Sequence, residues 1–251
     1  MKFTIVTVCY NAQKDIEKTI ESVLGQTYPD FQYIIKDGQS TDGTLELARN
    51  AVGSDPRVIV ESCKDNGIYD AMNQALQQTE GEYVFFLNAG DVFHDVDVLG
   101  RVSEFVDESG GDIVYGDIVL KEADKSRRKK YRGLYRCRLP YLIGGCICHQ
   151  AMFAKRELFV EKQFDVEYRI CADRDWQLYY LKKRVYFKSL GCVVADVLVD
   201  GFSRQNIELF EKEVEKCLKN HYSIGVHLYQ CIRKCKTYIF VNNSKDDETS
   251  I

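Results

Sequence analysis

Hydrophobic residues in the first half of the chain follow two alternating patterns. Short apolar runs rich in β-branched and aromatic residues predict four strands, at residues 3–10, 31–37, 57–62 and 83–88. Between these runs the apolar residues recur every three or four positions, as in Ile16, Ile20 and Val23, which predicts amphipathic helices. Strands that alternate with helices indicate an α/β fold, with a mostly parallel central sheet flanked by helices.

The second half of the chain is less regular. We predict a strand at 112–120, a charged hairpin after it, and helices at 171–183, 205–220 and 224–240. The helix that follows the predicted strand at 31–37 is expected to begin with Ser40 or Thr41 as its N-cap. We expect residues 1–204 to form one domain and residues 205–251 to form a C-terminal helical extension with an acidic tail.

Composition excludes several classes of protein. The chain has 251 residues, is 45% hydrophobic and carries a net charge of −4, so nucleic acid is not an expected partner. No apolar stretch is long enough to span a membrane. The ten cysteines are scattered and no export signal precedes them, which predicts reduced thiols and a cytoplasmic location. Cys146, Cys148 and His149 could bind zinc, but packed thiols are the favoured interpretation because no second ligand pair follows.

Six segments appear in an order that identifies a family. They are "VTVCYN", "SVLGQTY", "KDGQSTDGT", "KDNGIYDAMNQAL", "GEYVFFLNAGD" and "ADRDW". Together they resemble the family-two inverting glycosyltransferases of bacterial surface polysaccharide synthesis, over residues 1 to about 200. The resemblance implies a GT-A-type fold, a nucleotide-diphosphate sugar donor, most commonly of the UDP type, a divalent metal (Mg or Mn), and inversion at the anomeric carbon. The implied acceptor is a glycan or a lipid-linked glycan.

The nucleotide is expected at the carboxyl ends of the first strands, where parallel sheets bind ligands. By resemblance Asp37 accepts from a base N–H, although it could merely cap the "DGQST" turn. Thr7 and Tyr10 are candidates to line the base pocket, with ordinary packing as the alternative for Tyr10. Asp65 and Asn73 are predicted donor contacts around the start of the third helix.

The metal is expected at Asp91, which ends "YVFFLNAGD". Relatives carry two or more acids at this point, whereas this chain has Asn88 and Gly90 in their place. A metal held by one carboxylate and by the donor's diphosphate remains chemically reasonable. Asn88 would add a carbonyl oxygen or bind a hydroxyl, and Gly90 would let the donor approach the backbone. The alternatives are that Asp91 caps a turn and that the chain is a catalytically impaired nucleotide-sugar-binding domain.

The reacting end is expected at Asp173, which matches the family's catalytic base, with Asp175 as runner-up. Both would lie in the first turn of a helix, where the dipole favours a carboxylate. His149 could contact the metal, the diphosphate or the acceptor, or be a structural residue. Asp117 is a candidate for sugar hydroxyls, and Trp176 is expected in the core more often than against a sugar.

A basic segment at 125–132, "KSRRKKYR", interrupts an otherwise acidic chain. A solvated hairpin is the simplest interpretation. The functional alternative is an anchor for anionic lipid headgroups or for a phosphate of the acceptor, since each cation near such a surface contributes about 1 kcal/mol. This would make the protein peripheral on the inner face of the cytoplasmic membrane.

Overall fold

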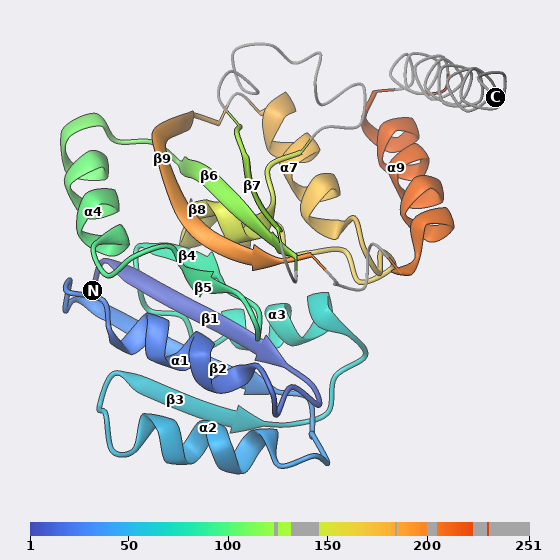
Figure 1. The fold of residues 1–251 in the computed structure, drawn as a ribbon. Helices are drawn as coiled ribbons and strands as arrows, with labels where there is room; N and C mark the ends of the chain where they lie inside the picture. Colours follow the sequence, from blue (N-terminus) through green and yellow to red (C-terminus); the bar gives the residue numbers. More distant parts are fainter. Residues whose placement is uncertain (123–124, 132–145, 184, 200–204, 223–229, 231–251) are drawn as a thin grey trace, which may run out of the picture.

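The computed structural model describes residues 1–122, 125–131, 146–183, 185–199, 205–222 and 230 (Figure 1). Its strands are β1 (Phe3–Cys9), β2 (Phe31–Asp37), β3 (Val58–Ser62), β4 (Tyr83–Phe86), β5 (Val92–Phe93), β6 (Ile113–Glu122), β7 (Lys125–Lys129), β8 (Met152–Lys155) and β9 (Phe187–Leu198). Its helices are α1 (Ile16–Leu24), α2 (Thr44–Val52), α3 (Ile68–Leu76), α4 (Val98–Ser109), α6 (Arg156–Glu161), α7 (Ala172–Lys182) and α9 (Ile207–His221), with a 3₁₀ turn η1 at His149–Ala151.

The strands form one sheet in the order β3-β2-β1-β4-β8-β6-β9-β5, and β7 pairs with β6. The first four strands are parallel, and each of β1, β2 and β3 is followed by a helix, as the hydrophobic pattern predicts. Beyond β4 the sheet is mixed, because β8 runs antiparallel to both of its neighbours while β6 and β9 are parallel. Sequence reasoning assigned no elements to β5, β8, β9 or α4.

The helix that follows β2 begins later than expected. The predicted caps, Ser40 and Thr41, precede it, and α2 begins at Thr44 after Gly43, whose φ is +93°. The side chain of Asp42 accepts from the backbone N–H and the hydroxyl of Thr44, at 3.0 and 2.5 Å. Asp42 therefore satisfies the first turn, and Ser40 instead accepts from the backbone N–H of Asn11.

The hairpin β6–β7 reaches past the edge at which β1 and β2 end. β6 runs in the same direction as β4, since both are antiparallel to β8. Ile5, Phe85 and Val114 lie in one row across the sheet. From that row β1 continues for four residues to Cys9 and β6 for eight to Glu122, so the hairpin overhangs the rim by roughly 13 Å at 3.3 Å per residue. The predicted charged hairpin is present, but its returning strand is Lys125–Lys129 rather than the segment after Tyr131.

Helix α9 packs against α7 beside the sheet (Figure 1). Its inner face is apolar, with Val214, Cys217 and Leu218 fully buried. The boundary expected at residue 204 stays a prediction, and the second predicted helix, 224–240, lies outside the described residues apart from position 230. Among the described residues, no helix combines the length and the hydrophobicity that crossing a bilayer requires.

Candidate active site

The loops after β1 and β2 interlock at the carboxyl rim. Asn11, with φ at +48°, accepts from the backbone N–H of Thr41 through its side chain at 2.9 Å. Asp37, fully buried, accepts from the N–H of Ser40 at 3.1 Å and from the hydroxyl of Ser62 at 2.6 Å. The carboxylate of Asp37 thus caps the turn, as the structural interpretation of this residue required, and it holds the ends of β2 and β3 together.

Tyr10 and Asp65 stand on either side of Gly38. Tyr10 is 65% exposed, so its ring is available to a ligand. A Cβ on Gly38 would lie 2.6 Å from Asp65 Oδ2 and 3.4 Å from Tyr10 Cδ2, which leaves room for glycine alone. Asp65 Oδ1 accepts from the N–H of Gly67 at 3.0 Å just before α3. The ring of Tyr10 and the carboxylate of Asp65 therefore both lie next to the backbone of Gly38, which carries no side chain.

A buried lysine underlies this rim. Lys36 is fully buried, and its ammonium donates to the carbonyl oxygens of Asp37 and Cys63 at 3.2 and 2.6 Å. It also lies 3.6 Å from Asp65 Oδ2. Sequence reasoning missed this residue, although a lysine inside a strand whose every residue is buried needs partners of this kind. Lys36 fixes the position of Asp65.

Two predicted donor contacts lie elsewhere. Thr7 is fully buried, and its hydroxyl shares a 2.9 Å hydrogen bond with Tyr33 inside the sheet. Both ends of the Asn73 amide bond the backbone of Phe164, at 2.8 and 3.0 Å, and so join α3 to the segment before α7. The structure gives both residues architectural contacts, and we leave them out of the donor site.

Asp91 lies buried where β4 leads into β5. Its Oδ1 accepts from the N–H of Leu198 and its Oδ2 from the side chain of Gln150, both at 3.0 Å. Burial raises the pKa of Asp91 to about 6, because these hydrogen bonds do not fully offset the loss of solvent. Gln150 is a second site residue that sequence reasoning missed, although it directly follows His149.

Gly90 is required by the protein itself and not by close approach of a donor. Its φ is +99°, and a Cβ there would lie 2.9 Å from Leu198 Cδ1 and 3.6 Å from Asp15 Cβ. The space beside Gly90 is therefore filled by β9 and by the start of α1. This replaces the reason that the sequence suggested for the glycine.

Asn88, His149 and Asp173 form a continuous row. The side-chain amide nitrogen of Asn88 lies 2.9 Å from His149 Nε2, and His149 Nδ1 lies 3.6 Å from Asp173 Oδ2. Asn88 Oδ1 and His149 Nδ1 are both buried and have no hydrogen-bond partner among the described residues. Buried polar atoms of this kind normally bond a partner, so this row is a ready binding place for a polar ligand.

Asp173 begins α7 and is 7% exposed. Its Oδ1 accepts from the N–H of Arg174 at 2.8 Å and lies 3.3 Å from the hydroxyl oxygen of Tyr69. Oδ2 is left facing His149. Tyr69 stood inside a quoted motif, yet its contact with Asp173, 104 residues away, could not be predicted from spacing.

Asp175, Trp176 and Asp117 are held by structural contacts. Asp175 binds His221 Nε2 at 2.7 Å and Lys162 Nζ at 3.2 Å. Trp176 is fully buried and stacks on Phe159 with 4.6 Å between ring centroids, which confirms its expected place in the core. Asp117 accepts from Arg128 and from the N–H of Tyr131, so both of its oxygens are engaged within the sheet.

The side chains present fit a metal only with help from a ligand. Within the part of the chain that the structure describes, no three His, Cys, Asp or Glu side chains gather closely enough to hold an ion. The Asp91 carboxylate and the carbonyl oxygen of the Asn88 side chain belong to the same turn after β4, and the Asn88 oxygen has no hydrogen-bond partner among the described residues. Mg²⁺ and Mn²⁺ accept such oxygen ligands and take the remainder from phosphates and water.

A family model described as "Glycosyl transferase family 2" matches residues 4–161. The matched region contains β1 to β4, the Asn88–Asp91 turn and His149. The chain belongs to this family. A PGL/p-HBAD biosynthesis glycosyltransferase of Mycobacterium tuberculosis is 31% identical over 90% of this chain and 87% of its own length. TuaG of Bacillus subtilis, named as a putative teichuronic acid biosynthesis glycosyltransferase, is 38% identical over 42% of both chains.

Solved structures support the same fold. TarS of S. aureus in complex with UDP matches with a TM-score of 0.68 at 20% identity, covering 88% of this chain and 67% of the other. The mannosyltransferase PcManGT of Pyrobaculum calidifontis, solved with GDP-Man and Mn²⁺, matches with a TM-score of 0.67 at 17% identity, covering 90% and 64%. The protein is therefore a family 2 glycosyltransferase with a GT-A-type fold, and its relatives act in surface glycan synthesis.

Proposed function

We propose that this glycosyltransferase moves a sugar from a nucleotide-diphosphate donor to an acceptor hydroxyl with inversion at the anomeric carbon. The observation that carries the proposal is the row from Asn88 through His149 to Asp173. It joins the end of β4, where the donor's diphosphate is expected, to the carboxylate at the start of α7. A donor and a general base placed at the two ends of this row would meet at one reacting centre.

Asp173 serves as the base in this proposal. Its Oδ1 accepts from the N–H of Arg174, while Oδ2 faces His149 and would accept the acceptor's proton. The freed oxygen attacks the anomeric carbon, and the bond from that carbon to the phosphate oxygen breaks. The nucleoside diphosphate leaves with that electron pair. His149 would donate to the sugar from Nδ1, the ring nitrogen that faces Asp173 and has no hydrogen-bond partner among the described residues.

A divalent metal would be held by Asp91, with Asn88 Oδ1 as a second ligand. When bound, such an ion neutralises negative charge on the leaving diphosphate. Gln150 and the backbone of Leu198 orient the Asp91 carboxylate. Because the protein supplies few ligands, the metal should bind tightly only together with the donor. The Mn²⁺ and GDP-Man in the complex of PcManGT support this interpretation.

Tyr10, Asp37 and Asp65 are proposed for the nucleotide. Tyr10 offers an exposed face for stacking on the base, and Asp65 borders the same strip of backbone. Asp37 Oδ2 already accepts from Ser40 and Ser62, so this carboxylate would also shape the rim. UDP is the proposed nucleotide, in keeping with the UDP and UDP-GlcNAc complexes of TarS.

The acceptor is proposed to be a glycan or a lipid-linked glycan that is met at a membrane surface. Lys125, Arg127 and Lys129 alternate along β7 and are exposed, so they share one face of the β6–β7 hairpin. Arg128, on the other face, is bound to Asp117. Changing these three exposed cations to Gln should weaken binding to anionic liposomes and spare binding to neutral ones. Equal binding by the variant and the wild type would contradict the membrane contact.

The experiment for the reaction itself is Asp173→Asn. We expect this variant to retain nucleotide binding and to lose transfer by at least 10²-fold, because a positioned base contributes about 10²–10⁴. Donor hydrolysis in the absence of acceptor serves as the assay. If the wild type neither hydrolyses nor transfers from any nucleotide sugar, the alternative of an impaired nucleotide-sugar-binding domain gains the advantage.

A further inference from the structure

The segment that leads into α7 is clamped by a buried carboxylate from α9. Glu213, only 6% exposed, accepts from three consecutive backbone N–H groups. Arg169 N bonds Oε1 at 2.8 Å, while Ile170 N and Cys171 N bond Oε2 at 2.9 Å each. Residues 169–171 are thereby fixed two positions before Asp173.

The position of Glu213 on its helix is unusual. It lies on the apolar face that Val214 and Cys217 share, where a leucine would be the ordinary choice. Burial of an acid in such a face is costly unless its hydrogen bonds are made, and here backbone donors of the α7 approach make them. An acid on the apolar stripe of a helix was therefore a sequence signal for this contact.

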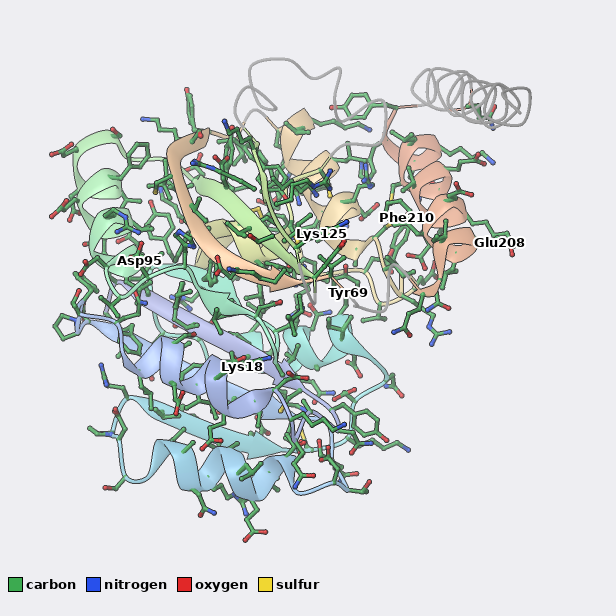
Figure 2. The ribbon with its side chains drawn as sticks, in the orientation of Figure 1. Lys18, Tyr69, Asp95, Lys125, Glu208 and Phe210 are labelled. Carbon is green, nitrogen blue, oxygen red and sulfur yellow. The ribbon has the colours of Figure 1, made fainter. Side chains whose placement is uncertain are left out.

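The same segment is held from the opposite side by α3. The hydroxyl of Tyr69 donates to the carbonyl oxygen of Ile170 at 2.7 Å and lies 3.3 Å from Asp173 Oδ1 (Figure 2). Ile170 is thus gripped at its N–H by Glu213 and at its C=O by Tyr69. Both backbone polar groups of Ile170, three residues before the proposed base, are therefore held by hydrogen bonds.

A second tie joins α9 to α7 on the far side of Asp173. His221 binds Asp175 at 2.7 Å, and Asn220 donates to the hydroxyl of Tyr168 at 3.1 Å. Helix α9 therefore contacts the segments before and after Asp173 without touching Asp173 itself. The family model ends at residue 161, so it contains neither α7 nor α9.

We propose that Glu213 is a positioning residue for Asp173, and that α9 is a working part of the catalytic centre. The inference rests on the proposed function, because it assumes that Asp173 is the base. Small displacements of a base reduce the rate steeply, since a shift of about 1 Å can cost about 10²-fold. The donor rim at Tyr10 and Asp65 belongs to other elements and should not respond to loss of Glu213.

The test compares Glu213→Gln with Lys216→Met, a control on the same helix whose partner Glu167 is at the surface. Gln has one acceptor oxygen in place of two and cannot accept all three N–H bonds. We expect Glu213→Gln to lower kcat at least tenfold with the donor KM within twofold of wild type. The thermal shift caused by nucleotide and metal should be retained. Lys216→Met should leave kcat and KM unchanged.

A second variant guards against a folding defect. Tyr69→Phe keeps the ring and removes only the hydroxyl that grips Ile170, so it should show the same division between kcat and KM. Wild-type kcat in folded Glu213→Gln and Tyr69→Phe would overturn the inference and leave the proposed function standing. Loss of donor binding together with kcat would also overturn it. Full transfer by Asp173→Asn would instead remove the proposed base, and the inference with it.

Discussion

His149 Nδ1 lies 3.6 Å from Asp173 Oδ2, while Nε2 of the same ring lies 2.9 Å from the amide of Asn88. One imidazole thus spans from the end of β4 to the start of α7. The His149 side chain is buried, with 7% of the residue exposed, and its Nδ1 has no hydrogen-bond partner among the described residues. This relationship places a polar group between the expected leaving group and the expected base.

Replacement of the His149 ring should slow the chemical step of the transfer. We predict that His149→Ala lowers kcat by about 10²-fold, the typical loss when one donor to a developing charge is removed. His94→Ala is the matched control, because His94 is 37% exposed in its side chain and pairs with Asp196 at the β5–β9 edge. Steady-state transfer kinetics of the two variants decide the matter, and equal, wild-type rates would contradict a role for His149.

Asp91 should oppose the stability of the free protein while enabling donor binding. Its pKa rises from 3.8 to about 6 on folding, so the native state binds this proton more tightly than the unfolded state does. The free energy of unfolding should therefore increase as the pH falls from 6 towards 4. At neutral pH the ionised group costs about 3 kcal/mol, by about 1.4 kcal/mol per unit. We predict that Asp91→Asn is no less thermally stable than wild type at pH 7.5.

The same protonation should weaken the donor complex of the wild type. Metal ligands must be deprotonated, so metal-dependent donor affinity should fall as pH drops below about 6. Titrations of nucleotide plus Mn²⁺ between pH 5 and 8 measure this directly. An affinity that is flat across this range would show that Asp91 is not a ligand.

Asp175 should contribute to stability with the opposite pH dependence. Burial alone would raise the pKa of Asp175, but His221 and Lys162 outweigh it and hold the pKa below its ordinary value. Its contribution is therefore present above 3.8 and is lost as pH falls through the lower folded value. We predict that Asp175→Asn loses about 3 kcal/mol at pH 7, as when one partner of a buried ion pair is removed.

Chemical denaturation at pH 7 and near pH 3 tests this, since the gap between Asp175→Asn and wild type should narrow in acid. Nucleotide binding by the variant should be unchanged. A variant that is as stable as wild type at pH 7, yet inactive, would indicate that Asp175 and not Asp173 is the base.

Tyr10 should act on donor affinity alone. Its side chain is 65% exposed, so Tyr10→Ala removes little packing. Stacking of a base on an aromatic ring contributes about 1–3 kcal/mol, so we predict a rise of about tenfold in the donor KM with little change in kcat or melting temperature. Tyr10→Phe keeps the ring and should behave as wild type. A donor KM unaffected by Tyr10→Ala would exclude stacking.

The sequence predicted those parts of the fold whose signals are local. The strand at 31–37 was placed to the residue, because every position of β2 is buried and apolar residues dominate it. The rule that ligands bind at the carboxyl ends of parallel strands pointed to the residues that end β1, β2 and β4 as site candidates. The mixed half was missed, since β8 is four residues long and β9 carries no clear alternation.

Site residues divided in the same way. Asp91, His149 and Asp173 were named from motifs, and the structure gathers Asn88, His149 and Asp173 into one row. The partners of Thr7 and Asn73 could not be predicted, because Tyr33 and the Phe164 backbone are 26 and 91 residues away. Contacts across such distances depend on tertiary packing, which residue spacing does not encode.

The most direct measurement is a thermal-shift panel of UDP, GDP and dTDP, each with and without Mn²⁺, on the wild type and Asp91→Asn. We predict that the wild type is stabilised by one diphosphate only when Mn²⁺ is also present, and that Asp91→Asn loses this joint effect while remaining folded. That result would identify the nucleobase of the donor and establish a metal site that is complete only when the donor is bound. Equal stabilisation of both proteins, or none with any diphosphate, would contradict it.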